Sequence, residues 1–377
     1  MAETPLRLCM YAPLLWPLWS DGRVPFSGGA EVQQAAIARG LAANGAEVSV
    51  VTCDFGQPSP TVVHGVTVRS SYRIEAGLPV LRFFHPRLSG AIRAIRATRA
   101  QVVYARGATL EAGVAYLAAQ TMGVPFVFGA AHEHDAHRSL PEIPNPRDQF
   151  FYRRALRGAA VVIAQTEVQR RLFREQFGVE ARVIRNMVTI PEHFADAGAN
   201  ETIVWLATYK SSKRPGWFLE AARALPNRRF VMCGVVPRPP DSTEVWEEVQ
   251  RAAAALPNLE VRGFLGRDEV SDLLRGAALF VHTSPAEGFP NTVLEAWAHG
   301  LPTICCTDPD GIIEREQLGT IASDVASLTL AIEEWMTAPE RRSATGSRNR
   351  AYASSVHSVS AVLAQLIRAF EDAIGRK

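Results

Sequence analysis

Short apolar runs alternate with longer helical segments along almost the whole sequence. In the first half, Leu6–Tyr11, Glu47–Thr52 and Gln101–Tyr104 have the length and apolar content of buried strands. Segments between them, such as Glu31–Asn44 and Leu110–Met122, have the length of helices. Strands that alternate with helices across short connections form a parallel sheet with helices on both faces. The sequence therefore predicts an α/β fold.

A polar stretch of small residues interrupts this alternation, which then resumes. A single hydrophobic core rarely grows beyond about 250–300 residues, and the chain has 377. We expect an N-terminal domain at 1–190, a linker at 191–202, a C-terminal domain at 203–355, and a helix at 356–377 that packs back toward the N-terminal domain. Doubly wound sheets bind ligands beyond the carboxyl ends of their strands. The pattern thus predicts two Rossmann-like domains that face each other across a ligand cleft.

Cysteine usage and hydropathy indicate the compartment. The five cysteines are odd in number and show no metal-ligand spacing, which argues against a disulfide framework. The most apolar early stretch, Leu8–Trp19, contains two prolines and is too short to span a membrane. It also lacks the basic start of a signal peptide. We expect a cytoplasmic protein.

The charge is distributed unevenly, although the net charge is only +2. Residues 1–190 contain 21 arginines and 14 acidic residues, a balance of +7. Many of these arginines lie in predicted helices. Trp16 and Trp19 lie close in sequence to a glycine-rich loop. Two interpretations stay open: ordinary solvated helix faces, or a peripheral contact with an anionic membrane at its inner face. Nucleic acid is not expected, because no binding motif accompanies the arginines.

One segment, residues 284–302, carries most of the predicted chemistry. It reads SPAEGFPNTVLEAWAHGLP and contains Glu287 and Glu295, eight residues apart. Glu287 lies in a loop after a strand, and Glu295 lies on the helix that this loop opens. Backbone N–H groups at the helix start favour an anion such as a diphosphate. Glu295 suits the two hydroxyls of a ribose, and Glu287 suits sugar hydroxyls. The alternative is that Asn291 caps the helix and both glutamates are solvated.

This segment resembles the signature of glycosyltransferase family 4, a family of retaining enzymes with the GT-B architecture. The shared pattern is an acidic residue, Gly, Phe or Tyr, Pro, Asn, a second Glu followed by Ala, and a small-Gly-Leu-Pro ending. The resemblance implies two Rossmann-like domains and a nucleotide-sugar donor. It also implies that the loop and helix start contact the donor through Gly288, Phe289, Pro290, Asn291 and Thr292.

Other landmarks of the family occur in the expected order. Residues 27–31, SGGAE, resemble the N-terminal glycine loop, so Gly28 and Gly29 are predicted to approach the donor. VIRNMV, residues 183–188, resembles the end of the N-terminal domain, although Met187 stands where Gly is usual. Lys213 matches the lysine that binds the donor phosphates.

The family's usual arginine five residues before this lysine is missing. Thr208 occupies its position, and a diphosphate favours two cationic partners. Lys210 and Arg214 are the nearest candidates to replace the missing charge.

A histidine-rich segment, AAHEHDAH at residues 130–137, lies where the family often has a histidine in the first domain. His132 is our choice, and His134 stays open. Two histidines and two carboxylates also suit a metal site. The family's chemistry requires neither a metal nor a cofactor, so we expect neither.

The resemblance implies a retaining glycosyltransferase. The acceptor hydroxyl attacks from the side that the diphosphate leaves, and the enzyme stabilises charge. Lys213 holds the diphosphate, Glu287 positions the sugar, and His132 contacts the sugar or the acceptor. The acceptor is a sugar, a lipid-linked molecule or a small molecule.

Three alternatives remain. The first is a non-catalytic nucleotide-sugar-binding or regulatory protein, which Thr208 suggests. The second is a nucleotide-sugar epimerase on the same architecture, and the third is a phosphorylase. A phosphorylase needs a pyridoxal lysine, for which the sequence gives no sign. A dinucleotide dehydrogenase is not expected, because no Gly-x-Gly-x-x-Gly follows the first strand.

Overall fold

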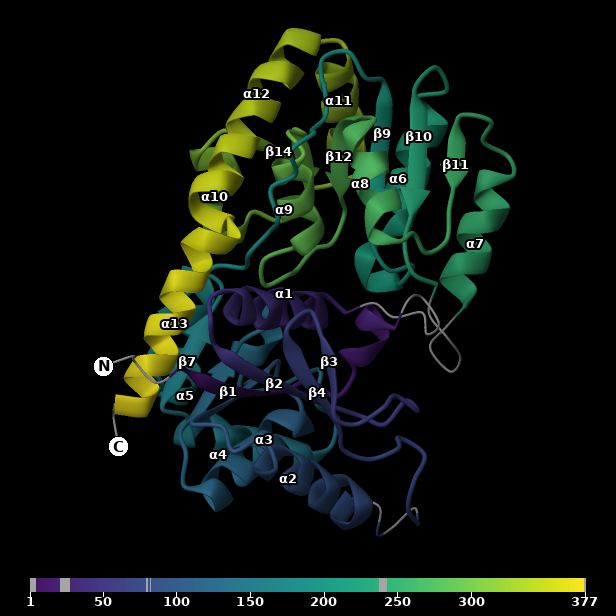
Figure 1. Ribbon diagram of the computed structural model, residues 1–377. Helices are drawn as coiled ribbons and strands as arrows, with labels where there is room; N and C mark the ends of the chain where they lie inside the picture. Colours follow the sequence, from purple (N-terminus) through teal and green to yellow (C-terminus); the bar gives the residue numbers. More distant parts are fainter. Residues whose placement is uncertain (1–4, 21–27, 79–80, 82, 237–242, 376–377) are drawn as a thin grey trace. The chain divides into compact units, whose positions relative to one another are not determined.

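The computed structural model describes residues 5–20, 28–78, 81, 83–236 and 243–375 (Figure 1). The chain divides into two compact units. Unit 1 comprises Met1–Met187 with Val359–Lys377, and unit 2 comprises Val188–Ser358. In each unit, helices cover both faces of a mostly parallel sheet. The predicted architecture of two Rossmann-like α/β domains is thereby confirmed.

Unit 1 contains an eight-stranded sheet in the order β3-β4-β2-β1-β5-β6-β7-β8. All neighbouring strands pair in parallel except β3 and β4. The strands are β1 Arg7–Tyr11, β2 Glu47–Thr52, β3 Thr61–Val63, β4 Val66–Ser70, β5 Val102–Arg106, β6 Phe126–Gly129, β7 Val161–Ala164 and β8 Ala181–Val183.

The edge of this sheet is a hairpin. β3 and β4 are antiparallel and are joined at His64 and Gly65. Both turn residues have positive φ, 53° and 77°. Two consecutive positive φ values are typical of the tight turns that join hairpin strands.

Side chains of β1 alternate between two cores, as the period of two in a strand requires. Cys9 and Tyr11 pack with helices on one face, and Leu8 and Met10 pack with helices on the other. The first face is covered by α2 Ser89–Arg96, α3 Leu110–Met122, α4 Pro146–Gly158 and α5 Glu167–Phe177. The second face is covered by α1 Gly29–Ala43 and α13 Val359–Gly375.

The C-terminal helix α13 belongs to unit 1. Its buried residues recur at helical spacing, as at Leu363, Leu366 and Phe370, and they pack in the same core as β1 and α1. The chain therefore leaves unit 1 after Met187 and returns to it at Val359. No helix in the described part of the chain is long and apolar enough to cross a membrane.

Unit 2 contains a six-stranded parallel sheet in the order β11-β10-β9-β12-β13-β14. The strands are β9 Thr202–Leu206, β10 Arg229–Cys233, β11 Leu259–Val261, β12 Ala277–His282, β13 Thr303–Cys305 and β14 Gly319–Ile321. One core contains α6 Pro215–Ala224, α7 Glu244–Ala253 and α11 Val325–Met336. The other contains α8 Arg267–Arg275, α9 Asn291–Ala298 and α10 Ile312–Arg315.

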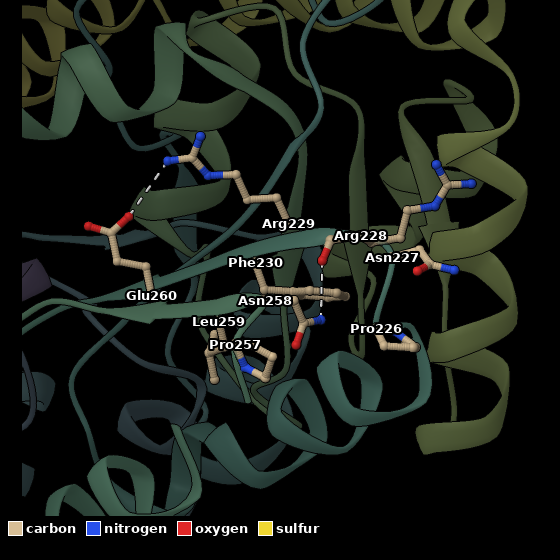
Figure 2. A pocket seen from close by; sticks show the side chains of 9 residues that line it. All are labelled: Pro226, Asn227, Arg228, Arg229, Phe230, Pro257, Asn258, Leu259 and Glu260. Atoms are coloured by element: carbon tan, nitrogen blue, oxygen red, sulfur yellow. Dashed lines mark hydrogen bonds and ion pairs between the residues drawn. The ribbon is translucent and has the colours of Figure 1, made fainter. Parts of the chain in front are cut away.

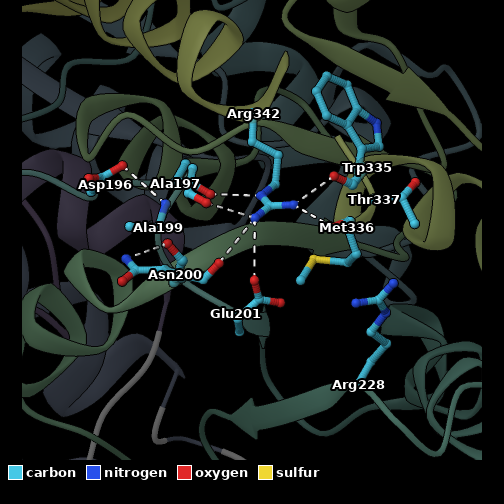
Figure 3. Close-up of polar contacts among 12 residues, drawn as sticks. Asp196, Ala197, Ala199, Asn200, Glu201, Arg228, Trp335, Met336, Thr337 and Arg342 are labelled. Atoms are coloured by element: carbon cyan, nitrogen blue, oxygen red, sulfur yellow. Dashed lines mark hydrogen bonds and ion pairs between the residues drawn. The ribbon is translucent and has the colours of Figure 1, made fainter. Parts of the chain in front are cut away.

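The stretch expected as a linker, 191–202, lies within unit 2. A buried arginine of helix α12 Pro339–Tyr352, Arg342, holds it there (Figure 3). Its guanidinium is 1% exposed and donates hydrogen bonds to five backbone carbonyls at 2.7–3.3 Å. Three of these carbonyls lie at 197–200, and two lie at Trp335 and Met336. Arg342 thus ties the segment before β9 to the end of α11.

Candidate functional site

The predicted donor residues of unit 2 follow its two central strands. β9 lies between β10 and β12, so the connections leave β9 and β12 toward opposite halves of the sheet. This is the topological switch point, beyond which parallel sheets bind ligands. Residues 207–214 follow β9, and residues 283–290 follow β12. The two segments that the sequence singled out therefore meet at the position that the fold favours for a ligand.

At this edge the structure brings Lys213 and Glu287 together, although 74 residues separate them. The ammonium group of Lys213 donates a hydrogen bond to Oε1 of Glu287. The side chains are 26% and 13% exposed, so the pair is screened from solvent but remains reachable. Burial works to raise the pKa of Glu287, but contact with His282 and the charge of Lys213 outweigh it and hold that pKa well below its ordinary value. Glu287 is therefore a carboxylate at every physiological pH.

A buried network fixes the backbone under Lys213. Thr283 Oγ1 donates a hydrogen bond of 2.5 Å to the Lys213 carbonyl oxygen. The same hydroxyl accepts a 2.8 Å hydrogen bond from Trp205 Nε1, in the neighbouring strand β9. Thr283 follows β12 directly, so β9 and β12 together set the position of the lysine.

Helix α9 begins without a side-chain cap. Its N-cap is Pro290, and no side-chain hydrogen bond caps it there. Asn291 is the first helical residue, so it is not the capping residue that the alternative interpretation required. The first turn of a helix has N–H groups without intrahelical partners, and the helix dipole adds about half a positive charge there. Phe289 is buried against Trp297, at a ring distance of 6.0 Å, and anchors this turn.

Glu295 lies on the second turn of α9, where its surroundings disfavour the ionised form of its carboxyl group. Burial raises the pKa of its carboxyl group, and the positive charge of Arg267 opposes this only in part. A carboxylate held in such surroundings costs stability unless a ligand supplies hydrogen bonds. Glu295 therefore has the character of a binding residue.

The candidates for a second cation differ in their surroundings. Arg214 adopts a left-handed backbone conformation, with φ 47°, and its guanidinium lies 4.9 Å from the centre of the Trp217 ring. Its charge also reaches Cys306: burial raises the pKa of that thiol to about 11, and Arg214 acts to lower it. Lys210 is exposed and precedes the short 3₁₀ helix Ser211–Lys213. Thr208 is half-buried in the same connection.

In unit 1, Gly28 and Gly29 form the start of helix α1. Gly28 is its N-cap with φ −146°, and no side chain caps it. Neither glycine has positive φ. Their contribution to a ligand site is that, without a side chain, the backbone can be approached closely. Ser27, the first residue of the glycine motif, lies outside the described residues.

His132 begins the short helix Glu133–Ala136 and is held in one orientation. Its Nδ1 accepts a 3.1 Å hydrogen bond from the backbone N–H of His134. A neutral imidazole that accepts at Nδ1 has its proton at Nε2, so His132 can donate a hydrogen bond to a substrate oxygen. The His134 ring lies 3.1 Å from Glu142. No group of three or more metal-ligating side chains occurs among the residues that the structure describes.

A hollow of about 570 Å³ lies elsewhere in unit 2 (Figure 2). It is lined by the first residues of β10 and β11, such as Phe230 and Glu260, at their amino ends. Its polar groups are engaged with one another: Asn258 donates to the Arg228 carbonyl at 3.1 Å, and Arg229 pairs with Glu260 at 3.8 Å. None of the predicted donor residues lines this hollow. We therefore assign the site to the carboxyl ends of β9 and β12.

Sequence reasoning missed two residues of this edge, His282 and Thr283. Both are buried polar residues at the end of a strand that is otherwise apolar. The pair directly precedes the segment 284–302, but it belongs to no motif that could have marked it.

Models of two families match the chain. The Glycosyl transferase 4-like domain matches residues 28–187, and Glycosyl transferases group 1 matches residues 200–338. Among curated proteins, none matches the sequence.

Solved structures with the same fold are distant in sequence. Sucrose-phosphate synthase from Thermosynechococcus elongatus has a TM-score of 0.79 at 15% identity, over 99% of this chain and 100% of its own. HepE from Anabaena, in complex with UDP and glucose, has 0.75 at 16% identity, over 97% and 99%. An E. coli trehalose-6-phosphate protein bound with UDP-2-fluoro glucose has 0.70 at 11% identity, over 97% and 99%.

Proposed function

The chain belongs to the glycosyltransferases that join a glycosyl transferase 4-like domain to a group 1 domain, and we propose that it is a retaining, metal-independent enzyme that uses a nucleotide-sugar donor. The acceptor is a hydroxyl group of a sugar, a lipid-linked molecule or a small molecule. The observation that carries this proposal is the Lys213–Glu287 pair beside the uncapped start of α9.

The donor diphosphate is bound by positive charge that this edge of the sheet supplies. Lys213 contributes one unit charge, and the start of α9 contributes about half a unit. Lys210 or Arg214 supplies the remaining charge in place of the arginine that Thr208 replaces. Because these groups neutralise the leaving diphosphate directly, the reaction needs no metal ion.

The remaining donor contacts follow from the positions of the two glutamates. Glu295 accepts hydrogen bonds from the ribose hydroxyls, which compensate the desolvation of its half-buried carboxylate. Glu287 accepts hydrogen bonds from the sugar and stabilises positive charge as it develops at the anomeric carbon. In relatives of this fold, HepE binds UDP with glucose and the E. coli protein binds UDP-2-fluoro glucose. Both support a UDP-sugar as the first donor to test.

In the proposed reaction, the acceptor oxygen forms a bond to the anomeric carbon on the face from which the diphosphate leaves. The bond between that carbon and the diphosphate oxygen breaks, and its electron pair stays on the diphosphate. The diphosphate oxygen takes the proton of the acceptor hydroxyl, so no protein base is required. The configuration of the sugar is retained. His132 of unit 1, with its proton at Nε2, is the candidate contact to the acceptor or the sugar.

A panel of UDP-, GDP- and ADP-sugars tests the proposal. Thermal shift measures binding, and release of the nucleoside diphosphate measures turnover, with and without a mixture of glycan and lipid extracts as acceptors. We expect one nucleotide class to stabilise the protein and to be turned over, and Lys213→Ala to abolish the turnover. Stabilisation by a donor without any release of diphosphate would instead indicate a nucleotide-sugar-binding protein.

A further inference from the structure

A third side chain reaches the Glu287 carboxylate. His282 is the last residue of β12 and is only 4% exposed. Its Nε2 lies 3.6 Å from Oε1 of Glu287. Its Nδ1 is buried and has no hydrogen-bond partner among the described residues. Two residues later, the Ser284 hydroxyl is 1% exposed and is also without a partner in the described part of the chain.

Both contacts to Glu287 converge on one oxygen. Lys213 and His282 each approach Oε1, and no hydrogen bond or ion pair from the described residues reaches Oε2. The ring and the ammonium group therefore fix one side of the carboxylate and leave its second oxygen available. A side chain held in this way presents a defined acceptor to a ligand.

The ammonium group of Lys213 cannot pair fully with Glu287 and with a diphosphate at the same time. When the ammonium group turns to the phosphates, Glu287 loses its strongest partner while its side chain stays mostly buried. A buried carboxylate without a partner is costly, and its position is no longer defined. A group that stays with Glu287 is then required, and the neighbour within reach is His282, whose Nε2–H can donate a hydrogen bond to Oε1.

We propose that His282 is a positioning residue, which holds Oε1 of Glu287 so that Oε2 faces the donor sugar after Lys213 has moved to the diphosphate. This rests on the proposed function. His282 does not touch the substrate. It acts only through Glu287, so its loss changes sugar orientation and turnover more than it changes affinity for the diphosphate.

The contact itself is tested without any donor. Chemical unfolding of the wild type, His282→Leu, Glu287→Gln and the double variant forms a double-mutant cycle. We expect the double variant to lose less stability than the sum of the two single losses. Strictly additive losses would overturn the proposal, whatever the enzyme's substrate is.

The positioning role is tested by kinetics with UDP-glucose and binding of UDP, or with the sugar and diphosphate of the class that the wild type accepts. For His282→Leu we expect kcat to fall about 10- to 100-fold, with diphosphate affinity unchanged within about twofold. His282→Gln keeps an N–H donor and should recover most of the loss. Thr303→Val is the matched control: it removes another buried polar group, on the adjacent strand β13, and should leave kcat unchanged.

Unchanged kcat in His282→Leu would refute the positioning role. Equal losses of kcat in His282→Leu, His282→Gln and Thr303→Val would also refute it, because they would indicate a general loss of stability. If the wild type neither binds nor turns over any donor, the proposed function fails, while the unfolding cycle still decides whether His282 and Glu287 are coupled.

Discussion

Replacing Glu295 by Gln should make the protein more stable and at the same time weaken its binding of nucleotide. Burial raises the pKa of this carboxyl group, with only partial opposition from Arg267. A group whose pKa is raised by folding contributes stability in its protonated form, and this stability is lost as pH rises through the folded-state pKa. Near neutral pH the wild type therefore bears the cost of ionising this half-buried carboxyl group, which Gln removes.

The loss of binding can be estimated from the proposed ribose contacts. A hydrogen bond to a charged group is worth about 1.5–3 kcal/mol, and about 1.4 kcal/mol corresponds to a factor of ten in affinity. Glutamine keeps one acceptor oxygen, so one of the two bonds is lost. We expect nucleotide affinity to fall about 10- to 100-fold.

The pH dependence of the two proteins should also differ. Wild-type affinity should fall as pH drops through the raised pKa of Glu295, because the protonated carboxyl group accepts fewer hydrogen bonds. Glu287 does not contribute to this decrease, since its pKa is depressed by its contacts with His282 and Lys213 despite its burial. The Gln variant should bind with little dependence on pH over this range.

Isothermal titration with UDP, or with the best nucleotide of the panel, and thermal unfolding measure the two effects. Glu334→Gln is the control, because Glu334 is an exposed glutamate of the same unit and should change neither quantity. Wild-type affinity in Glu295→Gln would refute the ribose assignment. A lower melting temperature near neutral pH would refute the argument from the desolvated carboxyl group.

Three further predictions concern other parts of the chain. Arg342→Met should lower the free energy of unfolding by about 3 kcal/mol or more, because five backbone carbonyls lose their buried donor. A denaturation curve that matches the wild type would contradict this. Lys210→Ala or Arg214→Ala should reduce turnover sharply with the fold intact, and Thr208→Arg should raise it if a cation is missing. Wild-type kinetics in both Ala variants would contradict the proposal that Lys210 or Arg214 replaces the missing arginine. Transfer should survive EDTA, and activity lost to EDTA and restored by Mg²⁺ or Mn²⁺ would show a metal requirement.

Much of the fold was predictable because strands and helices leave different periods in the sequence. The apolar runs Leu6–Tyr11 and Glu47–Thr52 predicted β1 and β2, and the interruption after residue 190 predicted two domains. Helix α12 was missed, since its sequence is rich in arginine and polar residues and its burial depends on groups such as Arg342 and Asn349. Strand β14 was missed because only three residues pair there, which is too short to produce a pattern.

The site was predictable in its residues but not in its contacts. The motif identified Glu287, Glu295 and Lys213, and the rule that ligands bind beyond the carboxyl ends of parallel strands explains why two of them meet. His282 could not be recognised, because a single histidine at the end of an apolar strand carries no motif. Its importance depends on a 3.6 Å approach to Glu287 that only the folded chain shows.

The anomeric form of the first sugar released from an α-linked donor tests the central proposal most directly. Slow hydrolysis of UDP-glucose, or of the α-linked donor that the panel selects, can be followed by proton NMR before mutarotation mixes the anomers. A retaining transferase should release α-sugar first, and Glu287→Gln should slow that release in a protein that still binds the nucleoside diphosphate. Release of β-sugar first, or undiminished release by Glu287→Gln, would contradict the mechanism proposed for this site.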